Sequence, residues 1–224
     1  ILESKAAALS ELLRSEEALA IFTDLVPRYS RVLGPDSRKT LEAEVGRAHL
    51  LERVKRLAES EAAHRTVIAR LEKVFGPDDA ALLVATNNFA LVLTGLEKYE
   101  EADQVMRDLA VRQERVFGQD HPEMLTTQHN RVRNFMKMGN WQAAEPICRA
   151  TLDARRRALG LDHPHTIYSR VALGQIALEL GHRVEAAALL PEAARMAEKV
   201  LGPDHATTKR ANEALARLRS PNVP

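Results

Sequence analysis

The 224-residue chain has little of several features that mark particular protein classes. Its one cysteine, Cys148, excludes an internal disulfide and is typical of a reducing compartment, so we expect a cytoplasmic protein. Neither sign of charge prevails, because 32 Lys and Arg stand against 31 Asp and Glu. No apolar run approaches the length of a membrane span. We therefore expect neither nucleic acid nor a membrane as a partner.

The sequence motifs of catalysis are also missing. We find no Gly-rich phosphate loop, no nucleophile elbow and no CxxC pair. Paired carboxylates such as Glu100 and Glu101 lie at predicted helix starts, where they complement the helix dipole. We predict no enzymatic activity, no catalytic residue and no cofactor, and we interpret Cys148 as a buried structural thiol.

One element is present five times at a constant spacing. The segments LGPDSRKT, FGPDDAAL, FGQDHPEM, LGLDHPHT and LGPDHATT begin at residues 33, 75, 117, 159 and 201, so each step is 42 residues. A fixed period of this size predicts stacked supersecondary units. We expect one array over 1–219, made of a truncated repeat (1–33), four full repeats (34–75, 76–117, 118–159, 160–201) and a capping helix (202–219), before a disordered tail (220–224).

Apolar spacing within each repeat predicts two helices joined by a short turn. Asp78 or Asp79 is expected to cap a first helix, and Gly139 and Gly181 are expected to end first helices in a left-handed conformation. The turn at residues 55–58 lacks glycine, so we predict a tighter or partly continuous bend there. In the repeat that begins at residue 76, we expect a buried stripe of Leu82, Leu83, Val84, Phe89, Ala90, Leu93, Leu96, Ala102, Val105, Met106, Leu109, Ala110, Val116 and Phe117.

Small residues and prolines mark further positions in the helices. Small residues in two slots should let paired helices approach closely: Ala48, Ala90 and Gly174 in first helices, and Ala18, Ser60, Ala102, Ala144 and Ala186 in second helices. Val132 departs from the first of these lines. Pro27 and Pro191 lie inside predicted second helices and are expected to bend them.

The segment from Asn87 to Ala102, NNFALVLTGLEKYEEA, with its 42-residue return to a GxDHP junction, resembles a tetratricopeptide repeat of the kinesin-light-chain type. The resemblance covers nearly the whole chain. It implies an all-α fold: a right-handed superhelical solenoid of helix-turn-helix repeats with a C-terminal capping helix, its first helices lining the concave side. The same repeat serves motor light chains, signalling ATPases and scaffolds, so the resemblance indicates the fold more sharply than the function.

The groove slots of that family, transferred to this sequence, give the candidate peptide-binding residues Asn87, Asn88, Leu91, Thr126, His129, Asn130, Arg133, Lys137, Tyr168 and Gln175. An asparagine in the slot of Asn88 and Asn130 clamps an extended backbone in groove-binding members of the family. The same slot holds Gly46 and Ala172 in the flanking repeats, so a clamp would be confined to the two central ones.

The charges and apolar residues among these slots suggest the chemistry of a partner. His129, Arg133 and Lys137 are expected to add positive charge, which favours an acidic segment. Tyr168, together with Met136 and Leu91, offers an apolar anchor. The competing interpretation is an ordinary solvated helix face.

Other titratable residues are interpreted as structural. His121, His163 and His205 recur at the junctions about one repeat apart, too far to share a metal ion, and should support helix starts. His64 and His182 have no partner at ligand spacing, so no metal site is expected. The run 155–157 (RRR) is predicted to be a solvated face.

Two functional hypotheses follow. The first is a non-enzymatic scaffold or adaptor that holds a protein or peptide in the concave groove. The second is a regulatory or sensor array excised from a larger signalling protein, such as a nucleotide-binding switch ATPase, since the sequence opens at Ile1 already inside a predicted helix. Homo-oligomerisation through the incomplete first repeat would cover Ile1, Leu2, Leu9 and Leu13.

Overall fold

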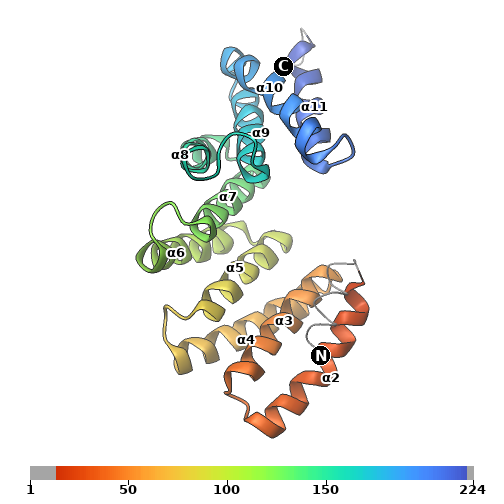
Figure 1. Cartoon of the computed structure of the whole chain (residues 1–224), viewed down its shortest axis with the longest axis vertical. Helices are drawn as coiled ribbons and strands as arrows, with labels where there is room; N and C mark the ends of the chain where they lie inside the picture. Colours follow the sequence, from red (N-terminus) through yellow and green to blue (C-terminus); the bar gives the residue numbers. More distant parts are fainter. Residues whose placement is uncertain (1–13, 221–224) are drawn as a thin grey trace. The chain divides into compact units, whose positions relative to one another are not determined.

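The computed structural model describes residues 14–220, which form ten α-helices and no strand (Figure 1). The expected first helix with its proposed oligomer contacts, and residues 221–224 of the expected tail, lie outside the described residues. Chain contacts divide the protein into two compact units between residues 116 and 117. None of the helices within 14–220 has both the length and the apolar character needed to cross a bilayer.

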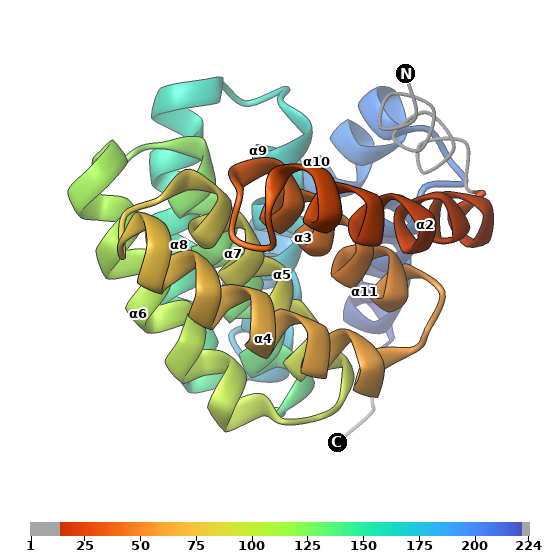
Figure 2. The same ribbon diagram turned by 90° about the horizontal axis from the view of Figure 1, so that it is seen from below.

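The first unit contains α2 (Ser15–Leu33), α3 (Arg38–Arg53), α4 (Leu57–Phe75), α5 (Ala80–Gly95) and α6 (Tyr99–Phe117), whose last residue begins the second unit. Helix α3 packs against both α2 and α4, as Figure 2 shows. The second unit contains α7 (Pro122–Lys137), α8 (Trp141–Leu159), α9 (Pro164–Glu179), α10 (Arg183–Leu201) and α11 (Ala206–Arg219).

Helix lengths reproduce the sequence period. The first helices α3, α5, α7 and α9 each have 16 residues. Their partners α4, α6, α8 and α10 each have 19 residues. The all-α repeat architecture is thus confirmed, and α11 follows the last pair as a single helix, packed against α9 and α10. A single continuous array over 1–219 stays a prediction.

Side chains at the junctions cap the first helices. Asp79 Oδ1 accepts hydrogen bonds from the backbone N–H of Ala81 and Leu82 at 3.0 and 3.2 Å. His121, His163 and His205 accept through Nδ1 from the N–H two residues later, at 3.2, 3.2 and 3.1 Å. Each satisfies an amide that has no partner inside the helix. The prediction that the junction histidines support helix starts is confirmed.

All four turns inside the repeats have one conformation. Lys55 and Glu97 have φ of 65° and 62°, beside 70° and 78° at Gly139 and Gly181. The next amide bonds back across the turn in each case, for example Arg56 N to Leu51 O at 2.9 Å. The expectation of a tighter or continuous bend at residues 55–58 was therefore wrong. Tertiary packing holds the left-handed conformation there although a side chain costs roughly 1–2 kcal/mol.

The small residues allow close helix packing, as predicted. Ala18, Ser60, Ala102, Ala144 and Ala186 are fully buried, and so are Ala48 and Ala90. At Gly174 the approach is tightest, because an added Cβ would lie 2.5 Å from Leu190 Cδ2. Helices α2, α8 and α10 continue through Pro27, Pro146 and Pro191.

Three residues of the predicted stripe are exposed, and two more, Leu96 and Val105, are half-buried. Val84 is 50% exposed, because two residues after Leu82 a helix has turned about 200° away from the buried face. Val116 and Phe117 are 40% and 37% exposed at the end of α6. The buried stripe retains Leu82, Leu83, Phe89, Ala90, Leu93, Ala102, Met106, Leu109 and Ala110.

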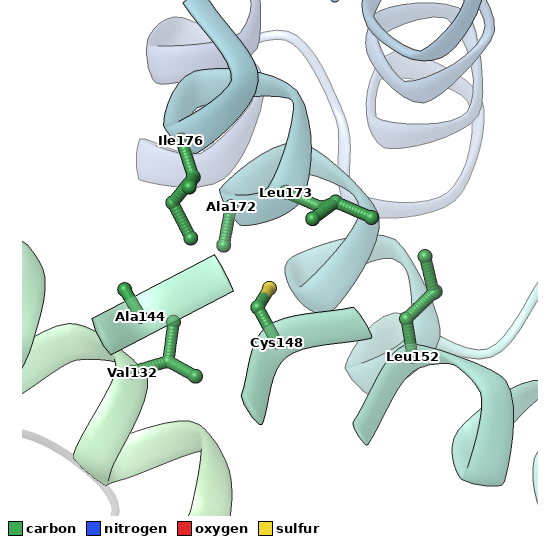
Figure 3. Close-up of a cluster of buried hydrophobic side chains, with 7 residues drawn as sticks. All are labelled: Val132, Ala144, Cys148, Leu152, Ala172, Leu173 and Ile176. Carbon is green, nitrogen blue, oxygen red and sulfur yellow. The ribbon is translucent and has the colours of Figure 1, made fainter. Parts of the chain in front are cut away.

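A cluster in the second unit joins α7, α8 and α9 (Figure 3). Cys148 points toward α9 in Figure 3, and its Sγ lies 3.4 Å from the carbonyl oxygen of Ser169. The residue is 1% exposed, and burial raises the pKa of its thiol to about 12. Cys148 is therefore the structural thiol that the sequence predicted. Val132, the larger residue in the small-residue line, is fully buried in the same cluster.

Candidate functional site

Three helices of the second unit share a hollow with a volume of about 280 Å³, which we call the α7–α9–α11 hollow. Helices α9 and α11 pack side by side (Figure 1). The lining residues are His129, Arg133, Met136, Tyr168, Val171, Ala172, Gln175, His205, Ala206, Thr207 and Arg210. Four predicted groove residues thus come together, on the first-helix face that the resemblance implied. Helix α11 adds residues that the sequence analysis assigned only to a capping helix.

The other predicted groove residues in this unit lie outside the hollow. Asn130 is buried, with 8% exposed, so little of its amide is available to a ligand. Thr126 Oγ bonds back to the carbonyl of Pro122 at 2.8 Å, and Lys137 is exposed at the end of α7.

The remaining candidates are in the first unit. Asn87, Asn88 and Leu91 are half-buried on α5. Their role in a groove stays a prediction.

Two positive charges line the hollow without a compensating acid. Neither Arg133 nor Arg210 has a hydrogen-bond or ion-pair partner within the described residues, and no acidic residue lines the hollow. Burial, and then the charge of Arg210, lowers the pKa of Arg133. A guanidinium nevertheless stays charged at neutral pH. The hollow is consequently a region of uncompensated positive charge.

His129 does not add to that charge. Desolvation, and then the nearby guanidinium groups of Arg155 and Arg133, lower the pKa of His129 to about 3. The imidazole is neutral at pH 7, so the expectation that it contributes a positive charge was wrong. Its Nδ1 is buried and has no hydrogen-bond partner in the described part of the chain.

One wall of the hollow is aromatic. The Tyr168 ring stacks on His205 with centroids 5.8 Å apart and an interplanar angle of 4°. Because the same His205 caps α11 through Nδ1, its ring orientation is fixed by the helix start. The stack gives a ligand a flat surface beside the two guanidinium groups.

The role of Arg155, which bonds to residues of α7 and α9, does not follow from the sequence analysis. Within the run predicted to be solvated, Arg155 is only 2% exposed. Its guanidinium donates to the carbonyls of Leu125 and His165 at 3.1 and 3.0 Å and to Ser169 Oγ at 2.8 Å. It therefore ties α8 to α7 and α9. Arg155 lies seven residues after Cys148, which is about two turns along the same face of the helix. This spacing was the signal in the sequence that Arg155 would be buried.

His182 also has partners that the sequence did not reveal. Ligand atoms of His182, Glu145 and Glu185 lie within 4.8 Å of one another. The Arg149 guanidinium already bonds both carboxylates, at 2.7 Å to Glu145 and 2.8 Å to Glu185. The two carboxylates therefore already share one cation of this chain, which offsets part of the negative charge that would attract a metal ion.

Comparisons with known proteins agree with this architecture. The model of the tetratricopeptide repeat family matches residues 39–109 and 123–199. No curated protein matches the chain.

Solved structures supply the remaining similarities. A set of nearly identical TPR-like repeats from Podosopora anserina, named after kinesin light chain, has a TM-score of 0.77 at 19% identity, covering 88% of this chain and 93% of that one. BtubC (BKLC) from P. vanneervenii has a TM-score of 0.68 at 16% identity, covering 98% and 81%. A Rap protein complexed with Competence and Sporulation Factor has a TM-score of 0.71 at 11% identity, covering 97% and 64%. At these identities the likeness is one of fold.

Proposed function

Because the chain belongs to the tetratricopeptide-repeat family, we propose that it is a non-enzymatic scaffold or adaptor that holds a partner protein segment in the α7–α9–α11 hollow. The observation that carries this proposal is the pair Arg133 and Arg210, two guanidinium groups on one lining that have no acidic partner among the described residues. Both side chains are exposed, and two like charges held on one lining raise the local positive potential. A segment of the opposite charge would supply the missing partner.

The rest of the hollow supports a peptide ligand with an acidic group and an apolar anchor. Met136 and Tyr168, both half-buried, line the hollow and offer apolar surface. Gln175 offers amide donors and an acceptor for backbone groups. The similar fold of Rap, in its complex with Competence and Sporulation Factor, is consistent with ligand binding on this scaffold. A cytoplasmic location, expected from the single cysteine, is part of the proposal.

The test is affinity capture with a charge-reversed variant. Arg133→Glu should lose the captured partner, because it places an acid beside the acidic segment. Arg219→Glu is the matched control, since Arg219 lies on α11 but does not line the hollow. Bound proteins would be identified by mass spectrometry, and the binding segment titrated by calorimetry. Equal capture by wild type and Arg133→Glu would show that the partner binds elsewhere.

A further inference from the structure

The α7–α9–α11 hollow brings two arginines together without an acidic residue on its lining. Several arginines elsewhere are held by the chain's own acids: Arg149 contacts Glu145 and Glu185, and Arg65 contacts Glu61 and Glu101. The hollow contains two guanidinium groups and no carboxylate within the described residues. They are close enough for the charge of Arg210 to act on Arg133. A ligand with about two negative charges would therefore be needed to neutralise the two guanidinium groups.

We propose that the α7–α9–α11 hollow binds a phosphate-type dianion, carried by the partner segment as a phosphorylated side chain. This inference rests on the proposed function for the identity of the carrier, although the site itself binds the phosphate group. A single carboxylate would neutralise only one of the guanidinium groups. A phosphate monoester carries about −1.5 to −2 charges at neutral pH and matches both.

The donors in the hollow suit the oxygens of a phosphate group. A guanidinium presents its N–H groups in a planar fork that bonds two phosphate oxygens at once. Arg133 comes from α7 and Arg210 from α11, so the two forks approach from different helices. The neutral His129 lines the same hollow and has a buried ring nitrogen without a partner among the described residues, and its ring can donate one hydrogen bond.

The start of α11 adds a favourable dipole. Ala206 and Thr207 line the hollow in the first turn of α11, where the helix presents its positive end. The volume of about 280 Å³ is just below the usual range for whole small-molecule ligands. It is sufficient for one phosphorylated side chain while the rest of the segment lies outside.

The experiment uses inorganic phosphate as the probe and the whole chain as the protein. Binding is followed by NMR of the arginine side-chain N–H groups and by calorimetry, at about pH 8, where phosphate is mostly doubly charged. Sulfate is the second dianion and acetate the single-charge comparison. The variants are Arg133→Gln and Arg210→Gln, with Arg219→Gln as the matched control on α11. All three arginines are exposed, so the substitutions leave the fold intact, which circular dichroism checks.

We expect phosphate and sulfate to bind at least about tenfold more tightly than acetate, because two charge-assisted contacts replace one. Each of Arg133→Gln and Arg210→Gln should weaken phosphate binding about tenfold, while Arg219→Gln leaves it unchanged. Equal affinity for acetate, binding that survives both variants, or no phosphate binding at millimolar concentration would each overturn the proposal.

The two proposals fail separately. If phosphate does not bind but Arg133→Glu still loses the captured partner, the hollow is a peptide site for single carboxylates. If phosphate binds but the captured partners are unaffected, the anion site is correct and the scaffold proposal is wrong for this face. Where Arg133→Glu does lose the captured partner, phosphatase treatment gives a direct readout of the phosphate, because its removal should release the partner from the wild-type protein.

Discussion

Substitution of Gly174 by alanine should destabilise the protein, although helix propensity alone predicts the opposite. Gly174 is inside α9, where alanine would gain about 1 kcal/mol over glycine. In the structure, however, the new Cβ would lie 2.5 and 2.8 Å from Leu190 Cδ2 and Cγ. Ordinary carbon–carbon contacts are about 3.5–4.0 Å. The overlap is therefore about 1 Å with a side chain on the facing helix.

Leu190 cannot move aside at low cost. It is fully buried and packs with Ala177, Ala186 and Ala214 in one cluster. Insertion of a methyl group into a packed core costs about 1–3 kcal/mol, and an overlap this large belongs in the upper half of that range. After the gain in propensity, we expect a net loss of about 1–2 kcal/mol, which is roughly 2–8 °C in Tm for a chain of this size.

The assay is urea unfolding followed by circular dichroism, with Gly95→Ala as the matched control. Gly95 is exposed at the end of α5, and an added Cβ would lie 3.3 Å from the half-buried Leu57 side chain. That side chain can shift by a few tenths of an ångström, so we expect Gly95→Ala to stabilise by up to about 1 kcal/mol. An equal or higher stability of Gly174→Ala would refute the packing argument.

Three further predictions follow from single positions. Glu97→Gly should raise the unfolding free energy by about 0.5–1 kcal/mol in urea, because it relieves a φ of 62°, whereas Gly139→Ala should lower it by a similar amount. Because the pKa of Cys148 is raised to about 12, iodoacetamide at about pH 8 should alkylate it only in urea; labelling of the folded protein would contradict its burial. Burial lowers the pKa of His64 to about 4, so the stability it contributes is present above its unfolded pKa of about 6.5 and is lost as the pH falls toward 4. The free energy of unfolding, measured with urea at pH 7 and at pH 5, should therefore be about 2 kcal/mol lower at pH 5 because of His64. The variant His64→Gln should not show this part of the decrease.

Electrostatics at the junctions shows how far local sequence can be interpreted. Asp120, the aspartate of the third junction, pairs with Arg157 at the end of the same repeat's second helix, at 3.4 Å. The sequence marked Asp120 as a repeated junction residue, but it gave no partner. The partner is 37 residues away in the sequence. The two residues meet only because the second helix of the repeat runs back along the first, so that its end lies beside the junction.

The sequence by itself determined the repeat, the helix pairs, the helix starts and the small-residue contacts. These follow from spacings within one or two helical turns and from a period of 42 residues, so neighbours along the chain were sufficient. It also placed His129, Arg133, Tyr168 and Gln175 on one face, and the structure brings these four together in one hollow.

Only the tertiary structure decided what surrounds those residues. Arg210 and Arg133, which are almost two repeats apart in the sequence, line one hollow because α11 packs against α9, one repeat before it. The burial of Arg155 and the neutral state of His129 depend on the same packing, since desolvation is set by every helix around a group. A periodic pattern specifies which side of a helix is covered. It does not specify which charges the covering helix brings into one site, because charged side chains lie outside the apolar pattern that sets the packing.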